Sequence, residues 1–402
     1  MALLPIETNA DTAPRRKAVE LARRTLALIE AKTTDQAATV MEVPVDGYLD
    51  PDRFQRESAI LFRERPVFAG FSGELTEPGQ YKTIDLPGCP VVLVRQRDGS
   101  LRGFVNACRH RGARLVDGAG SVAGDTFSCP SHTWCYGLDG ALSSMRAART
   151  FGHIDPDSTR LRPVGVAEGW GVIFIRAASA DHDLRELDVG ALLGEELSEQ
   201  FEHWGFGDLE FFGSRGFESA ANWKLVLDTQ LEPFLSTVHP SSLANMNYSD
   251  HATFDAHGAH ALMGVARKSI GALAGMAEEE WDPLEHVQFT YVLFPNTVLT
   301  VAASHVEYVQ VLPGREPART AAVHAYFTPR GGRGSSDERH TERYNRSLRT
   351  LVDESARLAE NIQHNLTARA VDRILVGRNE PAVQHQYRMY DEALQHYSGG
   401  LT

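Results

Sequence analysis

The chain has 402 residues, 42% of them hydrophobic and 23% charged, which indicates a globular protein with two or more domains. Its formal net charge of −13 argues against nucleic acid and against an anionic membrane surface as partners. Four cysteines offer no disulfide framework, and the sequence has no run of 18 apolar residues and no secretory signal. We therefore expect a cytoplasmic protein.

Two helices are predicted in the N-terminal segment, residues 1–65. Pro14 starts a helix that runs to about Lys32, with apolar residues at helical spacing. A loop with two prolines leads into a second helix at about 53–63. We expect this segment to pack on the C-terminal part of the chain.

Residues 66–178 are predicted to form a small all-β domain. Short β-rich runs alternate there with turn residues such as Asp98-Gly99 and Asp139-Gly140. The predicted strands lie at about 81–84, 90–95, 103–105 and 171–175.

Residues 179–402 are predicted to form the C-terminal domain. It begins with an acidic segment at 179–200 that is helical or linking. Four later runs have the apolar pattern of strands in a half-buried antiparallel sheet, at 287–294, 297–302, 305–312 and 320–327. A long helix is expected from about Asp337 to Ala368, so the fold class is α+β.

Two short motifs in the β domain pair a cysteine with a histidine. Cys108 and His110 are separated by one residue, and after 18 intervening residues come Cys129 and His132, separated by two. This set suits a 2Fe-2S cluster with two cysteines on one iron and two histidines on the other. Neutral imidazoles raise the potential of such clusters to about −150 to +300 mV. A structural zinc site is the alternative, although zinc ligands are usually spaced C-x2-4-C and H-x3-5-H.

Together with Trp134 and Tyr136, the pattern resembles a Rieske domain. Rieske proteins of quinol-oxidising complexes carry one more cysteine in each cluster loop, at the places of Ala113 and Ser131 in this chain. The sequence therefore resembles the ring-hydroxylating oxygenase branch, alpha (large) subunit. The resemblance implies a C-terminal domain of the helix-grip type. It also implies that the cluster ligands are Cys108, His110, Cys129 and His132.

The resemblance continues through the C-terminal domain. Asn222-Trp223-Lys224 followed by Asp228, Glu232 and His239 is similar to the segment that binds a mononuclear iron in this family, and 360–363 and 377–385 are similar to its terminal helix and return segment. The family holds that iron with two histidines and one carboxylate. The resemblance implies that Glu232 is a bridging carboxylate. In the family this group hydrogen-bonds a Rieske histidine and an iron-ligand histidine across a subunit boundary.

Two of the three iron ligands are missing from their expected positions. Leu235 stands where the first histidine is expected, or Phe234 if one residue is deleted, and Ser355 stands in the place of the carboxylate. His239 remains at the second histidine's place, and on this pattern we do not expect it alone to hold a mononuclear Fe(II) tightly. One alternative is a site rebuilt from Glu232, Glu354 and His239. Another is a shifted helix that offers Asp353.

Three functions follow as hypotheses. The first is a 2Fe-2S subunit that accepts electrons from a ferredoxin or flavin reductase and works with a catalytic relative, because its own iron ligands are incomplete. The second is an active mono- or dioxygenase that hydroxylates or demethylates a small organic substrate at an atypical iron site. The third is a redox sensor whose second domain only binds a small molecule. The resemblance further implies a homotrimer, or a hetero-hexamer with a catalytic alpha-type subunit.

Overall fold

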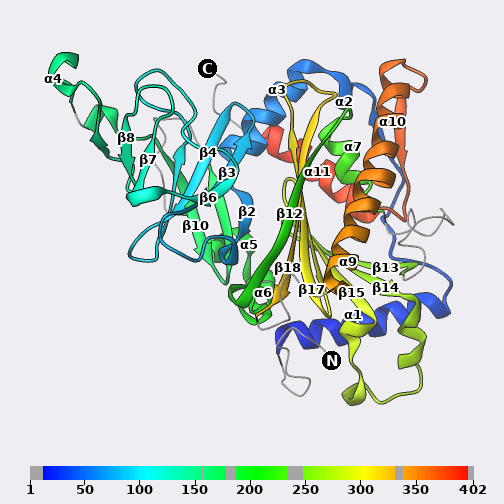
Figure 1. The fold of residues 1–402 in the computed structure, drawn as a ribbon. Helices are drawn as coiled ribbons and strands as arrows, with labels where there is room; N and C mark the ends of the chain where they lie inside the picture. The colour runs from blue at the N-terminus through cyan, green and yellow to red at the C-terminus, as the bar shows by residue number, and fades with distance from the viewer. Residues whose placement is uncertain (1–11, 156, 178–186, 233–247, 331–337, 397–402) are drawn as a thin grey trace. The chain divides into compact units, whose positions relative to one another are not determined.

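The computed structural model describes residues 12–155, 157–177, 187–232, 248–330 and 338–396. The chain forms two compact units (Figure 1). The large unit consists of 1–57 and 193–402, and the small unit of 58–192. The domain boundaries at 65/66 and 178/179 stay predictions. Among the described residues, no helix has both the length and the apolar character needed to cross a membrane.

A seven-stranded antiparallel sheet forms the centre of the large unit, in the order β12-β18-β17-β16-β15-β14-β13. Its strands are β12 (Leu209–Ser219), β13 (Tyr248–His257), β14 (His260–Arg267), β15 (Val287–Leu293), β16 (Thr297–Ala302), β17 (His305–Pro313) and β18 (Thr320–Pro329). The four apolar runs predicted as strands are β15 to β18. All six residues of β16 are buried, which explains why this strand has no polar alternation.

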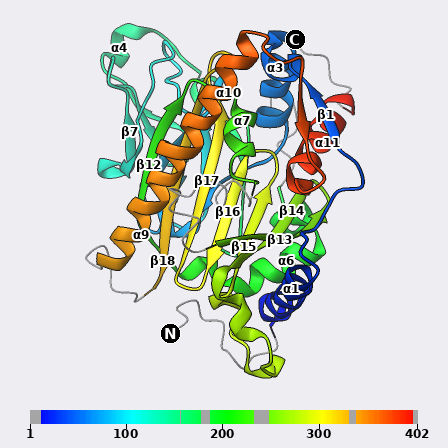
Figure 2. The ribbon, with the colours of Figure 1, turned by 90° about the vertical axis from the view of Figure 1, so that its right-hand side faces the viewer.

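Helices surround this sheet within the large unit (Figures 1 and 2). Among the described residues, the α-helices other than the long one are α1 (Ala13–Glu30), α2 (Asp46–Leu49), α3 (Pro51–Ala59), α6 (Glu195–Trp204), α7 (Trp223–Asp228) and α11 (Pro381–Gln395). The N-terminal helix α1 contacts β13, β14 and α6. Near α2, β1 (Met41–Pro44) pairs with β19 (Arg373–Val376). The predicted second helix is α3, which continues as one π-helical turn at Ile60–Glu64.

The long helix predicted at 337–368 is continuous but changes its winding in the middle. It consists of α9 (Glu338–Arg349), a π-helical segment η10 (Thr350–Ala356) and α10 (Arg357–Thr367). Figure 2 shows α9 and α10 running along the sheet. π-Helical turns inside α-helices are rare and are frequent at functional sites. The position of Ser355 in η10 is therefore of interest.

The small unit is built from two antiparallel sheets. One has the order β2-β11-β10-β5-β4-β3-β6 and the other β7-β8-β9. The strands are β2 (Val67–Phe71), β3 (Gln80–Leu86), β4 (Cys89–Arg95), β5 (Leu101–Val105), β6 (Ala119–Ser121), β7 (Thr126–Ser128), β8 (Cys135–Gly137), β9 (Leu142–Ser144), β10 (Pro163–Gly169) and β11 (Val172–Arg176). One-turn helix α4 (Ala148–Phe151) follows β9, and α5 (Val189–Leu193) begins near the end of the unit. The α+β class predicted from the sequence is confirmed.

Candidate functional site

The two Cys-His motifs lie in loops with the same backbone hydrogen-bond pattern. In the first, Cys108 N–H donates to the carbonyl of Ala113 at 2.8 Å, and Gly112 N–H donates to the carbonyl of Cys108 at 2.8 Å. In the second, Cys129 N–H donates to the carbonyl of Trp134 at 2.8 Å, and Thr133 N–H to that of Cys129 at 3.0 Å. Each loop thus closes on its cysteine in the same way.

The fifth residue of each loop has a left-handed backbone. Gly112 has a φ of 75°, which glycine adopts without a steric penalty, and Thr133 has a φ of 53°. For a β-branched residue such a φ is a true outlier, and backbone strain of this kind concentrates at functional sites. The strain at Thr133 supports a role for the second loop in ligand binding.

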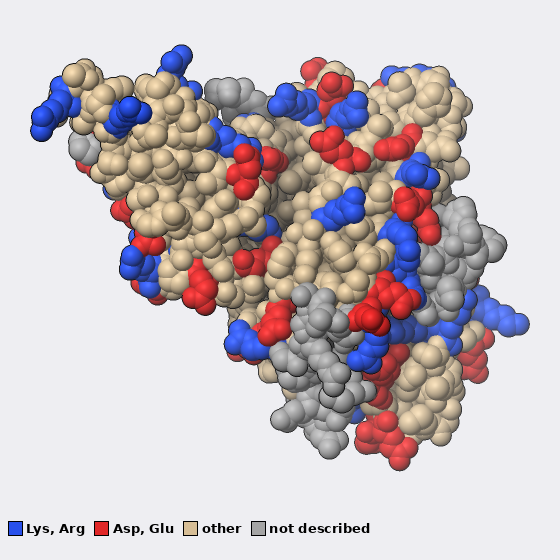
Figure 3. Space-filling model, viewed as in Figure 1, with Lys and Arg blue, Asp and Glu red and all other residues tan. Residues whose placement is uncertain are grey.

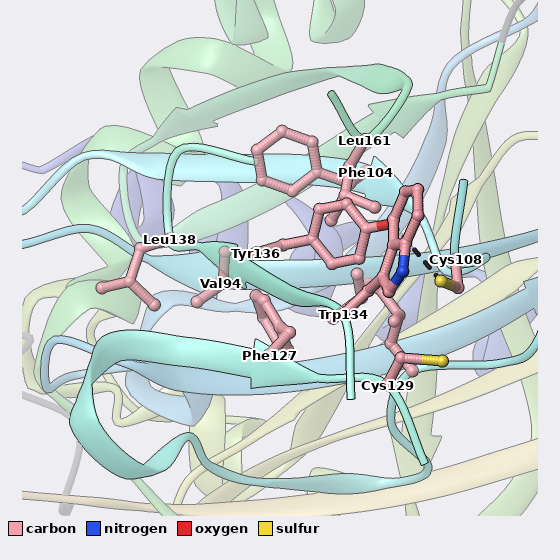
Figure 4. Close-up of a cluster of buried hydrophobic side chains, with 11 residues drawn as sticks. Val94, Phe104, Cys108, Phe127, Cys129, Trp134, Tyr136, Leu138 and Leu161 are labelled. Carbon is pink, nitrogen blue, oxygen red and sulfur yellow. Dashed lines mark hydrogen bonds between the residues drawn. The ribbon is translucent and has the colours of Figure 1, made fainter. Parts of the chain in front are cut away.

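The two cysteines anchor the loops in a hydrophobic cluster. Cys108 is 3% exposed and Cys129 is 2% exposed, and Figure 4 shows both sulfur atoms at one side of the cluster. The buried members of this cluster are Val92, Val94, Phe104, Cys108, Leu115, Phe127, Cys129, Trp134, Tyr136, Leu138 and Leu161. Burial raises the pKa of the Cys108 thiol, and the nearby Cys129 thiol adds to that rise. The two cysteines therefore offer two neighbouring buried sulfur ligands to one metal group.

Tyr136, which follows the second loop on β8, forms hydrogen bonds to the first loop. Its hydroxyl accepts from the backbone N–H of Arg109 at 3.0 Å and lies 3.3 Å from the sulfur of Cys108 (Figure 4). Because the oxygen already accepts from Arg109, its own proton can point to the sulfur. That hydrogen bond favours negative charge on the sulfur and lowers the pKa of Cys108 against the effect of burial.

The two histidines lie together at the surface end of the loops. The ring centroids of His110 and His132 are 4.8 Å apart, at an interplanar angle of 76°. Trp134 stacks on His110 at 4.9 Å and 10°, whereas His132 is exposed, with Nδ1 2.9 Å from the hydroxyl of Ser131. The structure therefore brings all four predicted ligands to one end of the small unit.

This arrangement fits a [2Fe-2S] cluster. Two buried thiols and two adjacent imidazoles offer two ligands for each iron, as the mixed ligand set requires. Within the described ranges, no three His, Cys, Asp or Glu side chains lie close enough to hold a single metal ion.

In the large unit, the predicted iron-binding segment begins with a capped helix. Asn222 is the N-cap of α7, and its side chain accepts from the backbone N–H of Lys224 at 3.0 Å. Gln363 accepts from the backbone N–H of Asn222 at 2.9 Å, and Glu360 accepts from that of Ala220 at 2.9 Å. These hydrogen bonds bring together two segments that resemble the same family, 222–224 and 360–363.

Lys224 forms a fully buried ion pair with Glu57 of α3. The ammonium lies 2.5 and 2.7 Å from the two carboxylate oxygens, and the side chains are 1% and 0% exposed. Arg53 and the indole N–H of Trp223 also donate to this carboxylate, at 2.8 and 3.2 Å. Burial lowers the pKa of Lys224, against the attraction of Glu57. This pair fixes α7 to the N-terminal segment.

Asp228, at the end of α7, belongs to a buried hydrogen-bond chain. The Tyr387 hydroxyl lies 2.8 Å from the Asp228 carboxylate and 2.6 Å from the Tyr48 hydroxyl. Burial raises the pKa of Asp228 well above its usual value. Burial, together with Glu380, raises the pKa of Glu232 to about 7, so Glu232 changes charge near neutral pH. The bridging role of Glu232 stays a prediction.

The remaining predicted iron positions fall partly outside the described residues. Leu235, Phe234 and His239 all lie outside them. Ser355 is 8% exposed and thus points inward from η10, as the expected ligand position requires. Asp353 is exposed and lies 4.0 Å from Arg357, so the shifted-helix alternative is not supported. The position expected for a carboxylate holds a buried hydroxyl, and the described residues supply no complete ligand set.

One polar group under α9 was not singled out from the sequence. Glu307 of β17 accepts from Ser347 of α9 at 2.7 Å and lies 2.9 Å from Nε2 of His324 on β18. Despite its burial, hydrogen bonds and the positive potential of His324 lower the pKa of Glu307 to about 2. Polar residues at alternating positions of a strand, His305 and Glu307, could have drawn attention to this group. The partners of Glu307 could not be predicted, because they come from a second strand and a helix.

Models of known protein families match residues in both the small unit and the large unit. Residues 65–158 match the model of the Rieske [2Fe-2S] domain, and residues 206–396 match the ring hydroxylating alpha subunit (catalytic domain). The first family carries a 2Fe-2S cluster, and the second uses a mononuclear iron.

Curated relatives are named as monooxygenases of carnitine, choline and glycine betaine. The carnitine monooxygenase oxygenase subunit of Escherichia coli K12 is 33% identical over 203 residues, 49% of this chain and 52% of that protein. Choline monooxygenase of Beta vulgaris is 27% identical over 67% of this chain and 59% of its own. The glycine betaine monooxygenase oxygenase subunit of Chromohalobacter salexigens is 31% identical over 52% and 45%. The chain spans about half the length of the curated relatives it matches.

Solved structures share the fold over nearly the whole chain. The quaternary ammonium Rieske monooxygenase CntA with L-carnitine has a TM-score of 0.73 at 20% identity and covers 94% of this chain and 99% of its own. Naphthalene 1,2-dioxygenase from Rhodococcus has a TM-score of 0.69 at 16% identity, with 95% and 99% coverage. At these identities the likeness concerns the fold alone.

Proposed function

Because the chain belongs to the family of Rieske ring-hydroxylating oxygenase alpha subunits, we propose that it is the oxygenase component of a system that oxidises a small quaternary ammonium compound. Its relatives named for carnitine, choline and glycine betaine act on compounds that share a trimethylammonium group. Electrons come from a separate ferredoxin or flavin reductase. In this reading the chain itself performs the oxygenation, which was the alternative on the sequence alone.

The observation that carries the proposal is the pair of matching cluster loops. Cys108 and Cys129 would hold one iron and His110 and His132 the other, and the cluster would supply one-electron transfer. The surrounding residues have their own tasks. Tyr136 donates to the Cys108 sulfur, and Trp134 supports the His110 ring by stacking. Glu232, with a pKa of about 7, is a group that can take up or release a proton under working conditions.

The test is turnover by the purified chain with a reductase as its only protein partner. Carnitine, choline and glycine betaine are offered one at a time under air, and product and oxygen uptake are measured together. We expect product from at least one of them, in proportion to the oxygen consumed. If the cluster is reduced but none of the three is converted, the assignment to ammonium substrates is wrong.

A second candidate function rests on Ser355. A buried hydroxyl is a poor Fe(II) ligand, so its presence at the carboxylate position favours an electron-handling subunit that works with a catalytic relative. This function predicts about two irons per chain and no oxygen uptake by the chain alone. A reproducible third iron, or product formed without a relative, excludes it.

We also propose that the chain assembles, as a homotrimer in the first case and as a hetero-hexamer in the second. Light scattering of the purified chain, alone and with a catalytic relative, separates the two. A stable monomer under all conditions contradicts both.

A further inference from the structure

A carboxylate lies on the side of the central sheet that faces α9. Glu307 of β17 has Thr300 of β16 and Tyr326 of β18 as its opposite neighbours in the sheet, so these three side chains share one face. Ser347 of α9 donates to this carboxylate at 2.7 Å, which identifies the face as the one beneath α9. Glu307 therefore lies between the sheet and the long helix.

The two carboxylate oxygens of Glu307 have different surroundings. Ser347 and Nε2 of His324 both contact Oε2, at 2.7 and 2.9 Å. Among the described residues, Oε1 forms no hydrogen bond, and the Glu307 side chain keeps 17% exposure, whereas that of His324 is 0% exposed. A carboxylate can accept about four hydrogen bonds. The two contacts on Oε2 hold the carboxylate in one orientation and leave Oε1 for a ligand.

The negative charge of Glu307 has no Lys or Arg partner within the part of the chain that the structure describes. Burial alone would raise the pKa of this carboxyl, but the hydrogen bond and the positive potential of His324 lower the pKa to about 2, so the group is ionised at neutral pH. Burial lowers the pKa of His305, on the same strand, to about 4, which keeps that imidazole neutral. Carboxylates inside proteins are nearly always paired with a cation. Only an imidazole is available here to balance the charge.

The outer side of the same helix has a different distribution of charge. Figure 3 shows basic and acidic side chains next to one another over α9 and α10. Glu342 of α9, for example, lies 2.7 Å from Arg346 and is 65% exposed, so water and a neighbouring cation both stabilise its charge. Glu307 has neither advantage to the same degree, and its charge points to a cationic ligand.

Aromatic rings gather around this carboxylate. Tyr344 stacks on His324 at a centroid distance of 5.4 Å and an angle of 13°, and Tyr326 lies 6.0 Å from Tyr344. His305 stacks on Tyr326 at 4.7 Å. Ring faces attract cations, and sites that combine such rings recognise quaternary ammonium groups. A quaternary ammonium group has no N–H to donate, so it is held by charge and by ring faces.

We propose that Glu307 is a specificity-determining residue that binds the quaternary ammonium group of the substrate, with Oε1 toward the cation and with His324 and Ser347 holding the carboxylate in place. The inference rests on the proposed function, from which it takes the class of substrate. Ser347 and Ser355 belong to one continuous helix and are separated by roughly 12 Å along it. A substrate bound at Glu307 therefore starts about two helical turns from the position expected for an iron ligand.

The test measures binding to the purified chain by isothermal titration calorimetry, without oxygen and without a reductase, so that no turnover takes place. The probes are L-carnitine, choline and glycine betaine. Each is paired with its uncharged-head analogue, in which a tert-butyl group replaces the trimethylammonium group. We expect Glu307→Gln to weaken binding of the tightest ammonium probe by about tenfold or more, and to leave binding of its tert-butyl analogue unchanged. Glu342→Gln, on the outer side of α9, is the matched control and should bind every probe as the unaltered chain does.

A second variant, Glu307→Asp, keeps the charge but moves it by one methylene group, and should lose less affinity than Glu307→Gln. Urea denaturation shows whether the variants are folded. If Glu307→Gln yields too little folded protein, the unaltered chain decides, because it should bind the ammonium probe about tenfold or more tighter than the tert-butyl analogue. Equal binding of these two, or full affinity of Glu307→Gln for the ammonium probe, overturns the proposal and leaves the proposed function intact. If no ammonium probe binds the unaltered chain, the proposed class of substrate is wrong and this inference is wrong with it.

Discussion

The two predicted iron sites of this chain differ in how their ligands are distributed along the sequence. The cluster loops place all four ligands between Cys108 and His132, and each loop closes through the same two hydrogen bonds. The second predicted site draws on 232–239 and on Ser355, which lie far apart in the sequence. A site built from short loops can be identified from spacing alone, whereas a distributed site can lose single ligands while the helices around it persist.

The largest expected effect concerns the cluster loops. Cys129→Ser removes a ligand that is 2% exposed, and His132→Ala removes an imidazole from the other iron. Each should abolish the red-brown visible absorption of the purified protein, because an iron with one protein ligand is not held. Cys135→Ser, a neighbouring cysteine outside the motif, is the matched control and should keep the colour. Colour retained in His132→Ala would show that the ligand assignment is wrong.

The next effect concerns the buried ion pair of the large unit. Lys224→Met leaves the Glu57 carboxylate buried with less compensation, which should cost about 3–5 kcal/mol of unfolding free energy. Urea denaturation measures this loss. The double variant Lys224→Met/Glu57→Leu should recover much of this loss, because it also removes the buried carboxylate. A double variant as unstable as the single one would mean that packing, not charge, dominates there.

A pH effect is expected from Glu232. Burial and Glu380 raise its pKa to about 7, above the ordinary value of about 4.3 for an exposed glutamate. Between these values the folded chain holds a proton that the unfolded chain has lost, so stability falls as the pH rises from about 4.5 to 7. Across this pH range, the titration of Glu232 lowers the free energy of unfolding by up to about 3 kcal/mol. Glu232→Gln should flatten this part of the stability curve, and a curve that keeps its full slope would contradict the shift.

A smaller effect is expected at Tyr136. Tyr136→Phe deletes the hydroxyl that lies 3.3 Å from the Cys108 sulfur, and with it a hydrogen bond that favours the more negative, reduced cluster. The reduction potential should fall by about 50–100 mV, as the loss of a charge-assisted hydrogen bond in a one-electron couple suggests. Protein-film voltammetry measures it. The control Tyr81→Phe, at the edge of the same hydrophobic cluster, should leave the reduction potential unchanged. A potential that stays unchanged or rises in Tyr136→Phe would contradict this hydrogen bond.

Much of the fold could be predicted because its signals are local. The strands β15 to β18 are apolar runs bounded by turn residues, and the cluster motif lies in one short stretch. The π-helical turn that carries Ser355 gave no such signal, since apolar spacing does not record a change in winding. The contacts of Glu57 with Lys224 and of Glu307 with Ser347 join residues far apart in the chain, so only the folded structure reveals them.

The smallest effect is expected at Ser355. If this hydroxyl holds no iron, Ser355→Ala should leave the iron content unchanged and alter stability by no more than about 1 kcal/mol. Iron analysis together with urea denaturation checks both points. A loss of iron in this variant would show that the serine does contribute to a metal site.

The central claim is that this chain oxygenates a small quaternary ammonium compound with electrons received through its own cluster. The most direct measurement is single turnover: the chain is reduced anaerobically, freed of reductant and mixed with oxygen and carnitine, choline or glycine betaine. The account predicts oxidised product from one of these substrates, in step with reoxidation of the cluster and with no other protein present. Reoxidation without product, and product only after addition of a relative that has all three mononuclear-iron ligands, would contradict it.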